Sequence, residues 1–197
     1  KDYENVERYS IYSPYLLCVS HLYPYKNIPR MIEAFKQATK STKNNHKLLI
    51  AGEKRSKQYY NEIIETIKKE NLQDNVILLG PVSKEDLRYL YSSCEYLIFP
   101  SPCENFAYTL VEAMCCGAAI VCANTTAMPE TCKDAALYFN PDNKDEMAEG
   151  MKLLINQKEL KKSMKQKSLI RIKELPNYEE VTQQTYAIFT SLYKSVL

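Results

Sequence analysis

Glycine is scarce in this sequence, with four residues among 197. The loop after the first apolar run, "SHLYPYKN", contains none. The chain therefore has neither the G-x-G-x-x-G turn of dinucleotide-binding domains nor a P-loop at this point. These common phosphate-binding loops are excluded, so a bound phosphate would have to be held by side chains and by helix N-termini.

Metal-ligating residues are also few. The only histidines are His21 and His46, and none of the seven cysteines forms a C-x-x-C pair. Cys18 in "YLLCV" and Cys122 in "AAIVCA" lie inside apolar runs. A zinc site is the alternative, but this spacing favours small core residues of a reduced, cytosolic chain without a bound metal or cofactor.

Neither sign of charge dominates, and no long apolar run is present. Lys and Arg total 26 against 24 Asp and Glu, so no broad field attracts nucleic acid or a membrane. No run approaches the roughly 18 apolar residues of a membrane span, and no signal peptide is recognisable. We therefore predict a cytoplasmic protein. Because the chain opens on Lys1 instead of methionine, we also expect it to be a segment of a longer polypeptide.

Short apolar runs alternate with amphipathic helical patterns. Residues such as Ile28, Met31, Ile32 and Phe35 recur at helical spacing between the runs. This order requires crossover connections and predicts a doubly wound, Rossmann-like parallel sheet of about six strands with helices on both faces and a helical C-terminal segment. The predicted strands are 15–19, 47–51, 75–79, 95–99, 118–122 and 136–139.

Three parts of the chain follow from this pattern. Residues 1–14 form a lead-in, 15–177 the Rossmann-like domain, and 178–197 a last helix that packs back on the domain or toward a missing N-terminal domain. Helix starts are predicted at Asn27 with Pro29, and at the Ser83–Asp86 capping box.

Ligands of open parallel sheets bind beyond the carboxyl ends of the strands. The loop after the first predicted strand carries Lys26 just before a helix start, with His21 five positions earlier. A lysine beside free helix N–H groups is a good phosphate partner. The alternative is a solvated loop lysine.

The stretch "SPCENFAYTLVEAMCCGAAIV" follows another predicted strand. We predict a helix from Phe106 to Cys116, ended by Gly117 at the C′ position, with Glu104 at its N-terminus. There a carboxylate either serves as a capping acid or accepts hydrogen bonds from sugar hydroxyls.

Glu112 lies within the same predicted helix, flanked by core-type residues, where it needs donors such as ribose hydroxyls. The N–H groups at the helix start are expected to point at a diphosphate. These groups belong to Asn105, Phe106, Ala107 and Tyr108.

Glu104 and Glu112 are eight residues apart, which in a helix is about 12 Å. That distance is too long for the two cooperating acids of a glycosidase.

Three features of this region are specific: the spacing of Glu104 and Glu112, the following "AMCCGAAIVCANTTAMPE" and the preceding "NVILLGPVSKEDLRYLYSSCEYLIFPS". Together they resemble the C-terminal donor-binding domain of group 1, or family 4, retaining glycosyltransferases. "YLLCVSHLYPYKNIPRMIEAF" fits the opening of that domain. Members have the GT-B fold, two Rossmann-like domains with the active site between them, so residues 15–177 are expected to bind the nucleotide sugar.

The resemblance implies a role for each site residue. Lys26 holds the donor diphosphate, Glu104 holds the transferred sugar as the catalytic residue, and Glu112 binds the ribose. The backbone around Val82 contacts the base. The N–H groups of Phe106, Ala107 and Tyr108 face the phosphates or the sugar. The implied reaction transfers a hexose from a UDP- or GDP-sugar to an acceptor glycan or lipid-linked glycan with retention and without a metal.

Three positions depart from the family pattern. His21 stands where arginine is frequent, so a neutral imidazole predicts a weaker grip on the diphosphate. Asn105 and Ala107 stand where glycines are frequent, and alanine predicts an ordinary helical conformation at Ala107.

Two other functions share parts of this pattern. One is a nucleotide-binding module without turnover, and the other is a GT-B sugar-nucleotide epimerase, against which the Glu104 and Glu112 spacing argues. A basic segment adds a further hypothesis, because its four lysines share one helix face. That face is either solvated or a peripheral contact with the inner face of a membrane. The lysines are Lys158, Lys161, Lys162 and Lys165.

Overall fold

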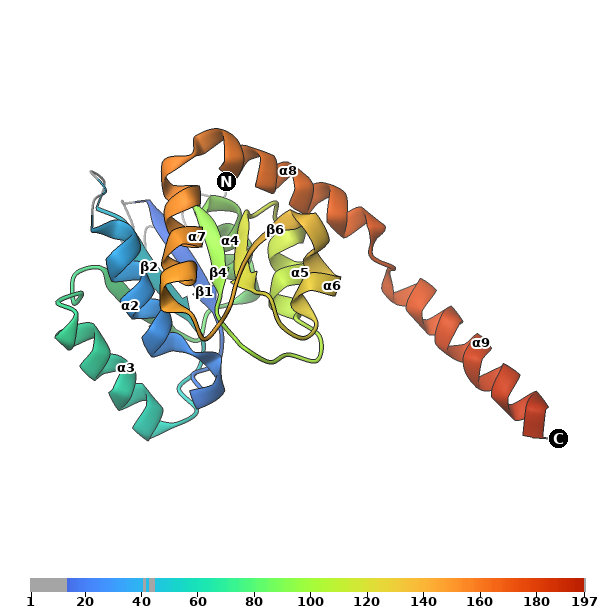
Figure 1. Ribbon diagram of the computed structural model, residues 1–197. Helices are drawn as coiled ribbons and strands as arrows, with labels where there is room; N and C mark the ends of the chain where they lie inside the picture. Colours follow the sequence, from blue (N-terminus) through green and yellow to red (C-terminus); the bar gives the residue numbers. More distant parts are fainter. Residues whose placement is uncertain (1–13, 41, 43–44, 197) are drawn as a thin grey trace.

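A six-stranded parallel sheet forms the centre of the computed structural model, which describes residues 14–40, 42 and 45–196 (Figure 1). The strand order β3-β2-β1-β4-β5-β6 is that of a doubly wound sheet, so the predicted fold class is confirmed. The predicted lead-in lies outside the described residues except for Pro14. The strands are β1 Tyr15–Val19, β2 Lys47–Ala51, β3 Val76–Gly80, β4 Tyr96–Phe99, β5 Ile120–Ala123 and β6 Ala136–Phe139.

Two groups of helices cover the sheet, as the crossover connections require. The helix α2 packs against α3 and α7, whereas α5 packs against α4, α6 and α8. Figure 1 shows α8 running from the end of α7 toward α5. The helices are α2 Ile28–Thr39, α3 Lys57–Lys69, α4 Lys84–Ser93, α5 Tyr108–Cys115, α6 Met128–Cys132, α7 Lys144–Asn156, α8 Lys158–Glu174 and α9 Tyr178–Val196, with 3-10 turns η1 Pro24–Lys26 and η2 Lys133–Ala135.

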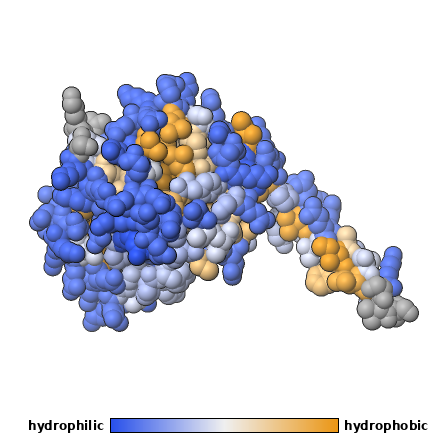
Figure 2. All heavy atoms as spheres, viewed as in Figure 1, coloured by the Kyte–Doolittle hydropathy of each residue, from blue (hydrophilic) through white to orange (hydrophobic). Residues whose placement is uncertain are grey.

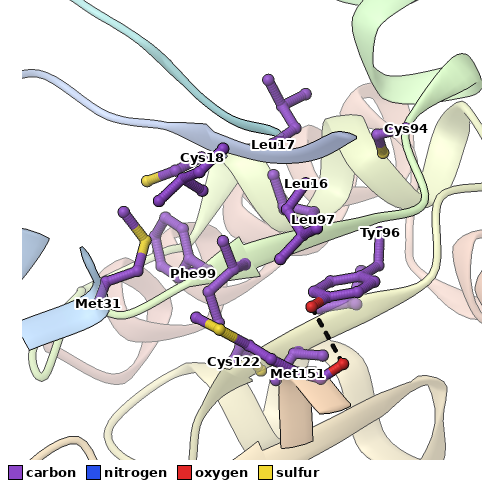
Figure 3. Close-up of a cluster of buried hydrophobic side chains, with 14 of the residues drawn as sticks. Leu16, Leu17, Cys18, Met31, Cys94, Tyr96, Leu97, Phe99, Cys122 and Met151 are labelled. Carbon is purple, nitrogen blue, oxygen red and sulfur yellow. Dashed lines mark hydrogen bonds between the residues drawn. The ribbon is translucent and has the colours of Figure 1, made fainter. Parts of the chain in front are cut away.

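The core includes the two central strands, β1 and β4, whose side chains are buried on both faces of the sheet (Figure 3). Leu16 and Leu17 of β1 and Tyr96 of β4 are fully buried. The Tyr96 hydroxyl donates a hydrogen bond of 3.1 Å to the carbonyl of Met151 in α7. That bond satisfies a buried polar group and ties the last third of the domain to the sheet.

The end of α5 is defined by a Schellman motif, as the glycine predicted. Gly117 has φ 67°, and its N–H donates to the Met114 carbonyl at 3.0 Å. The Ala118 N–H donates to the Ala113 carbonyl, also at 3.0 Å. Because this turn uses residues 117 and 118, β5 begins at Ile120, two residues later than predicted.

The two predicted helix starts have different chemistry. Ser83 caps α4, since its hydroxyl accepts a hydrogen bond of 3.2 Å from the Asp86 N–H. Asn27 precedes α2 as predicted, but its backbone is left-handed, with φ 56°, and its side chain makes no cap. The Asn27 side chain instead binds two other loops, described below.

The four lysines of α8 do not form one free face. Lys161 pairs with Glu95, and the Lys165 ammonium donates to the Cys94 carbonyl at 3.2 Å. Burial lowers the pKa of Lys161 from its ordinary value. Two of the four cations therefore attach α8 to the residues that precede β4, and only Lys158 and Lys162 are exposed.

The last helix, α9, extends away from the domain (Figure 1). Figure 2 shows apolar side chains along its surface. In this structure α9 does not pack back on the domain, which leaves contact with another domain as the standing prediction. Among the described helices, none combines the length and the apolar character needed to cross a membrane. The large apolar side chains exposed on α9 are Tyr178, Val181, Tyr186, Ile188, Phe189, Leu192 and Tyr193.

Candidate functional site

Two adjacent cavities lie at the carboxyl ends of the central strands. The Lys26 cavity, about 220 Å³, is lined by Lys26, Glu104 and the loops after β1 and β4. The Val82 cavity, about 290 Å³, is lined by Val82, Pro81 and the loop after β2. Both share Val19, Ser20, His21 and Thr109. They form one crevice where the strand order reverses between β1 and β4, the place where open α/β sheets bind ligands.

Lys26 and Glu104 meet in this crevice although 78 positions separate them in the chain. The lysine ammonium forms an ion pair with Glu104 Oε1, and the side chains are only 13% and 17% exposed. The ammonium also lies 4.8 Å from the centre of the Tyr25 ring. The pair places one fixed positive and one fixed negative charge, both able to bind a polar ligand, in a partly desolvated site.

The loop that carries Lys26 is held from the side by Asn27. The Asn27 amide donates to the Pro141 carbonyl after β6 at 2.8 Å and to the Pro100 carbonyl after β4 at 3.4 Å. Arg30 donates to the same Pro141 carbonyl at 2.8 Å. Asparagine tolerates the left-handed backbone that aims its amide this way. From the sequence, Asn27 was predicted only to start a helix, and its contacts with two other loops were not predicted.

The loop that carries Glu104 is held by two threonines after β5. The Glu104 N–H donates to Thr126 Oγ1 at 3.1 Å, and the Thr125 hydroxyl donates to the Pro102 carbonyl at 2.8 Å. Thr126 has φ 49°, an unusual conformation for a β-branched residue. Such strain persists only where the surroundings enforce it. Neither threonine was singled out from the sequence.

His21 lines both cavities and is exposed. Its Nδ1 atom accepts a hydrogen bond of 3.3 Å from the Glu53 N–H. The neutral ring therefore carries its proton on Nε2. That proton makes His21 a hydrogen-bond donor to an anion even without a positive charge.

The helix α5 begins later than predicted, at Tyr108 instead of Phe106. Ala107 has φ −81° and ψ 72°, and the Tyr108 N–H donates to the Phe106 carbonyl at 2.9 Å. This is an inverse γ-turn, so the prediction of a helical Ala107 was wrong. Glu104 consequently lies in a loop and does not cap the helix. Among the described residues, the N–H groups of Asn105, Phe106 and Ala107 have no hydrogen-bond partner, whereas that of Tyr108 has one.

Glu112 is the second residue at which the structure differs from the prediction. It is exposed on α5 and is not enclosed by core residues, because the helix turns its apolar face, with Leu110, Ala113 and Met114, toward the sheet. Its Oε2 atom accepts a hydrogen bond of 3.0 Å from the hydroxyl of Tyr91. Burial, and after it the charge of Glu112, raises the pKa of Tyr91 above its ordinary value, so the tyrosine remains a donor.

The position of Glu112 relative to the crevice follows from these contacts. It lines a third cavity of about 310 Å³ between α4 and α5, with Lys84 and Arg88. This cavity and the Val82 cavity share Leu87. Glu112 is thus one side chain away from the crevice, whereas Lys26, Glu104 and His21 line it directly.

Gly52 is a site residue that the sequence analysis did not identify. It follows β2, has φ 151°, and its N–H donates to the Gly80 carbonyl at 2.9 Å. A Cβ atom there would lie 1.9 Å from the carbonyl oxygen of Ser20. Only glycine allows the loops after β1 and β2 to approach this closely and form the floor of the Val82 cavity. Its place directly after "KLLIA" was the available signal.

The described residues contain no group of three or more His, Cys, Asp or Glu side chains arranged to hold a metal ion. The cysteines in apolar runs pack as predicted. Cys18, Cys94, Cys122 and Cys132 are buried, whereas Cys103 and Cys115 are exposed.

The sequence profile described as "Glycosyl transferases group 1" matches residues 7–170. A relative in Escherichia coli, O-antigen chain mannosyltransferase B, is 30% identical over 132 residues. The match covers 66% of this chain and 34% of that protein. A second relative, the N-acetylgalactosamine-N,N'-diacetylbacillosaminyl-diphospho-undecaprenol 4-alpha-N-acetylgalactosaminyltransferase of Campylobacter jejuni, is 29% identical over 180 residues, which are 87% of this chain and 47% of that protein. The chain thus spans a third to a half of these relatives.

Solved structures show the same fold. HepE from Anabaena in complex with UDP-glucose has a TM-score of 0.85 at 19% identity, over 96% of this chain and 52% of that one. The C-terminal domain of a glycosyl transferase group 1 family protein from Francisella tularensis has a TM-score of 0.77 at 18% identity. That match covers 88% of this chain and 92% of the solved domain.

Proposed function

Since the chain belongs to the family of group 1 glycosyl transferases, we propose that it is the donor-binding domain of a retaining glycosyltransferase. The enzyme moves a hexose from a UDP- or GDP-sugar to an acceptor hydroxyl, in the synthesis of a cell-surface polysaccharide or glycolipid. The relatives support a sugar-transfer reaction, because both carry the name of a sugar transferase. The solved complex of HepE with UDP-glucose supports a nucleotide sugar as the donor.

The diphosphate binds at the Lys26 end of the crevice. Lys26 supplies the positive charge, His21 donates from Nε2, and the N–H groups of Asn105, Phe106 and Ala107 point from the loop before α5. These donors stabilise the negative charge that develops on the leaving diphosphate when the anomeric C–O bond breaks. The positive end of the α5 helix dipole also stabilises this negative charge. The Tyr108 N–H is not one of these donors, because it is already bonded to the Phe106 carbonyl.

The sugar and the nucleoside occupy opposite ends of the crevice. Glu104 accepts hydrogen bonds from hydroxyls of the transferred hexose and is the catalytic residue. The base lies in the Val82 cavity against the backbone of residues 80–82. Glu112 reaches the ribose from the edge of α5 while Tyr91 keeps its carboxylate in place.

One observation carries the proposal. Lys26 and Glu104 come from the loops after β1 and β4, the two strands at which the strand order reverses, and both line one cavity next to a second, less polar one. An activated sugar needs this sequence of environments, with a carboxylate for hydroxyls, a cation for phosphates and an apolar cavity for the base.

Calorimetric titration of the chain with UDP-, GDP- and ADP-hexoses tests the proposal. We expect micromolar binding of one of them, weakened at least tenfold, or about 1.4 kcal/mol, in Lys26→Ala and in Glu112→Ala. Lys158→Ala, which removes an exposed lysine of α8, is the matched control and should bind as the unchanged chain does. Equal affinity for all three nucleotides in the unchanged chain and in Lys26→Ala would contradict the proposal.

A further inference from the structure

Four aromatic side chains are exposed around the mouth of the Lys26 cavity. Two come from the loop after β1, one from the loop before α5 and one from the first residue of α5, and all four line the same cavity. Large aromatic groups gathered at one exposed place mark a contact site, because each leaves apolar surface in water. We call them the aromatic rim: Tyr23 is 36% exposed, Tyr25 52%, Phe106 49% and Tyr108 71%.

The rings of the aromatic rim are held in pairs. Tyr23 and Tyr25 stack with their centres 5.7 Å apart and their planes at 15°. Phe106 and Tyr108 meet edge to face with their centres 4.6 Å apart. The loops beneath them are themselves held, one by the Asn27 amide and the other by Thr126. A ligand that stacks on rings ordered in advance loses less conformational entropy on binding.

The chemistry of the rim combines apolar ring faces with a charged centre. The Lys26–Glu104 ion pair lines the same cavity as both ring pairs, and its ammonium lies 4.8 Å from the centre of the Tyr25 ring. A purely hydrocarbon ligand would strip water from this ion pair without replacing its hydrogen bonds. A pyranose ring fits better, because its C–H face stacks on an aromatic ring while its hydroxyls reach the tyrosine hydroxyls and the ion pair.

The order of the two cavities indicates whether a pyranose on the rim belongs to the donor or to the acceptor. In the proposed donor complex the nucleoside lies in the Val82 cavity and the transferred hexose lies over Glu104. The four rim residues line the same cavity as Glu104, and none of them lines the Val82 cavity, so a sugar stacked on them would be the neighbour of the transferred hexose and not of the nucleoside. We propose that the aromatic rim binds a pyranose ring of the acceptor glycan. This inference rests on the proposed function, because it takes its direction from the donor.

Nuclear magnetic resonance titration with neutral methyl pyranosides of the manno, gluco, galacto and N-acetylglucosamine series tests the inference, on the chain saturated with UDP or with GDP, whichever it binds. We expect one glycoside to shift the amide signals of the loops after β1 and before α5. The Tyr25→Ala/Tyr108→Ala double variant should weaken that binding at least fivefold. The Tyr25→Phe/Tyr108→Phe variant, which keeps the rings, should stay within threefold of the unchanged chain. Tyr186→Ala, which removes an exposed tyrosine of α9, is the matched control.

Three results would overturn the inference. One is that no glycoside binds, or that a glycoside binds the unchanged chain and the double alanine variant equally. Another is that the double variant loses affinity for the UDP-sugar but keeps its affinity for UDP, which would assign the rim to the donor sugar. The third is self-association of the chain that the double variant abolishes, which would make the rim a protein contact.

The titration with UDP or GDP alone separates this inference from the proposed function. If neither UDP nor GDP binds, the donor assignment fails, and glycoside binding is then measured without a nucleotide. If one of the two nucleotides binds and the glycosides do not, only the rim assignment fails. Should the double variant not fold, as judged by circular dichroism, the single variant Tyr108→Ala takes its place, because Tyr108 is the most exposed of the four.

Discussion

Lys26 and Glu104 neutralise each other across the crevice. Glu104 therefore competes with the proposed diphosphate for Lys26, and Lys26 competes with the proposed hexose hydroxyls for Glu104. The ion pair restricts the rotamers of the Lys26 side chain and holds its ammonium in the cavity that Phe106 and Ala107 also line. A diphosphate has to share Lys26 with Glu104. The hexose hydroxyls, in turn, gain a carboxylate whose position is already set.

The variant Glu104→Gln separates these two effects. We expect the affinity for UDP alone to rise about two- to fivefold, because releasing a partly buried lysine from its carboxylate is worth roughly 0.5–1 kcal/mol. The extra affinity that an attached hexose adds should fall, since the amide is a weaker acceptor than the carboxylate. Calorimetry with UDP and with the UDP-sugar measures both. Glu95→Gln, which breaks the ion pair with Lys161 away from the crevice, should change neither.

Gly52 and Gly80 provide a second comparison at the scale of single residues. Both have positive φ, but an added Cβ at Gly52 would lie 1.9 Å from the Ser20 carbonyl oxygen, whereas nothing lies within 4 Å at Gly80. We expect Gly80→Ala to cost about 1 kcal/mol of unfolding free energy, from the backbone alone. Gly52→Ala should cost at least about 2 kcal/mol and weaken nucleotide binding, because the floor of the Val82 cavity must move. Urea unfolding of both variants checks this, and equal losses would show that the close approach is unimportant.

At the scale of elements, α8 shows how a charged helix face is divided by packing. Lys158, Lys161, Lys162 and Lys165 share a face by their spacing, but the helix docks on part of that face. Helical periodicity gives the relative orientation of side chains, and the neighbouring structure decides which of them are covered. Glu95 and the Cys94 carbonyl, both far away in sequence, take two of the four lysines.

Alanine variants of the four lysines should therefore fall into two classes. Lys161→Ala and Lys165→Ala are expected to lower the unfolding free energy by about 0.5–1.5 kcal/mol, since each removes a partly buried charged contact. Lys158→Ala and Lys162→Ala should leave it unchanged. Thermal unfolding measures the difference. Binding to vesicles of anionic lipid would depend on the exposed pair, so loss of vesicle binding confined to Lys158→Ala and Lys162→Ala would support the membrane hypothesis.

The element α5 illustrates why boundaries near a site are hard to predict. Its end was predictable, because Gly117 is the residue that the left-handed C′ position favours. Its beginning was not, since no propensity distinguishes Phe106 and Ala107 from helical residues. The inverse γ-turn at Ala107 forms in a loop that two threonines hold from 20 or more positions away in sequence.

At the scale of the whole molecule, the buried tyrosines make the fold sensitive to alkali. Burial raises the pKa values of Tyr15, Tyr91 and Tyr96 above their ordinary value, and that of Tyr59 to about 12. These groups are protonated in the folded chain at pH values where the unfolded chain ionises. Their contribution is therefore complete below the ordinary tyrosine pKa of about 10 and is lost as the pH rises toward the folded values.

We expect the free energy of unfolding to fall by about 5 kcal/mol between pH 9 and pH 11 through these four tyrosines. The tyrosinate absorbance should rise in two phases after a jump to alkaline pH. Part of the absorbance should rise at once, and the part that comes from the buried tyrosines should rise only as the circular dichroism of the helices is lost. A single fast phase with the fold intact would show that the buried hydroxyls are accessible.

The local chemistry of the sequence was enough to determine the parallel doubly wound sheet, most strand bounds, the cap at Ser83 and the turn at Gly117. Each depends on apolar periodicity or on a residue within a few positions. The tertiary structure alone decided that Lys26 pairs with Glu104, that Glu112 is exposed beside Tyr91, that Thr126 and Asn27 hold the loops, and that two lysines of α8 are covered. These contacts join segments 20 to more than 100 positions apart, and their geometry depends on how the whole sheet brings its loops together.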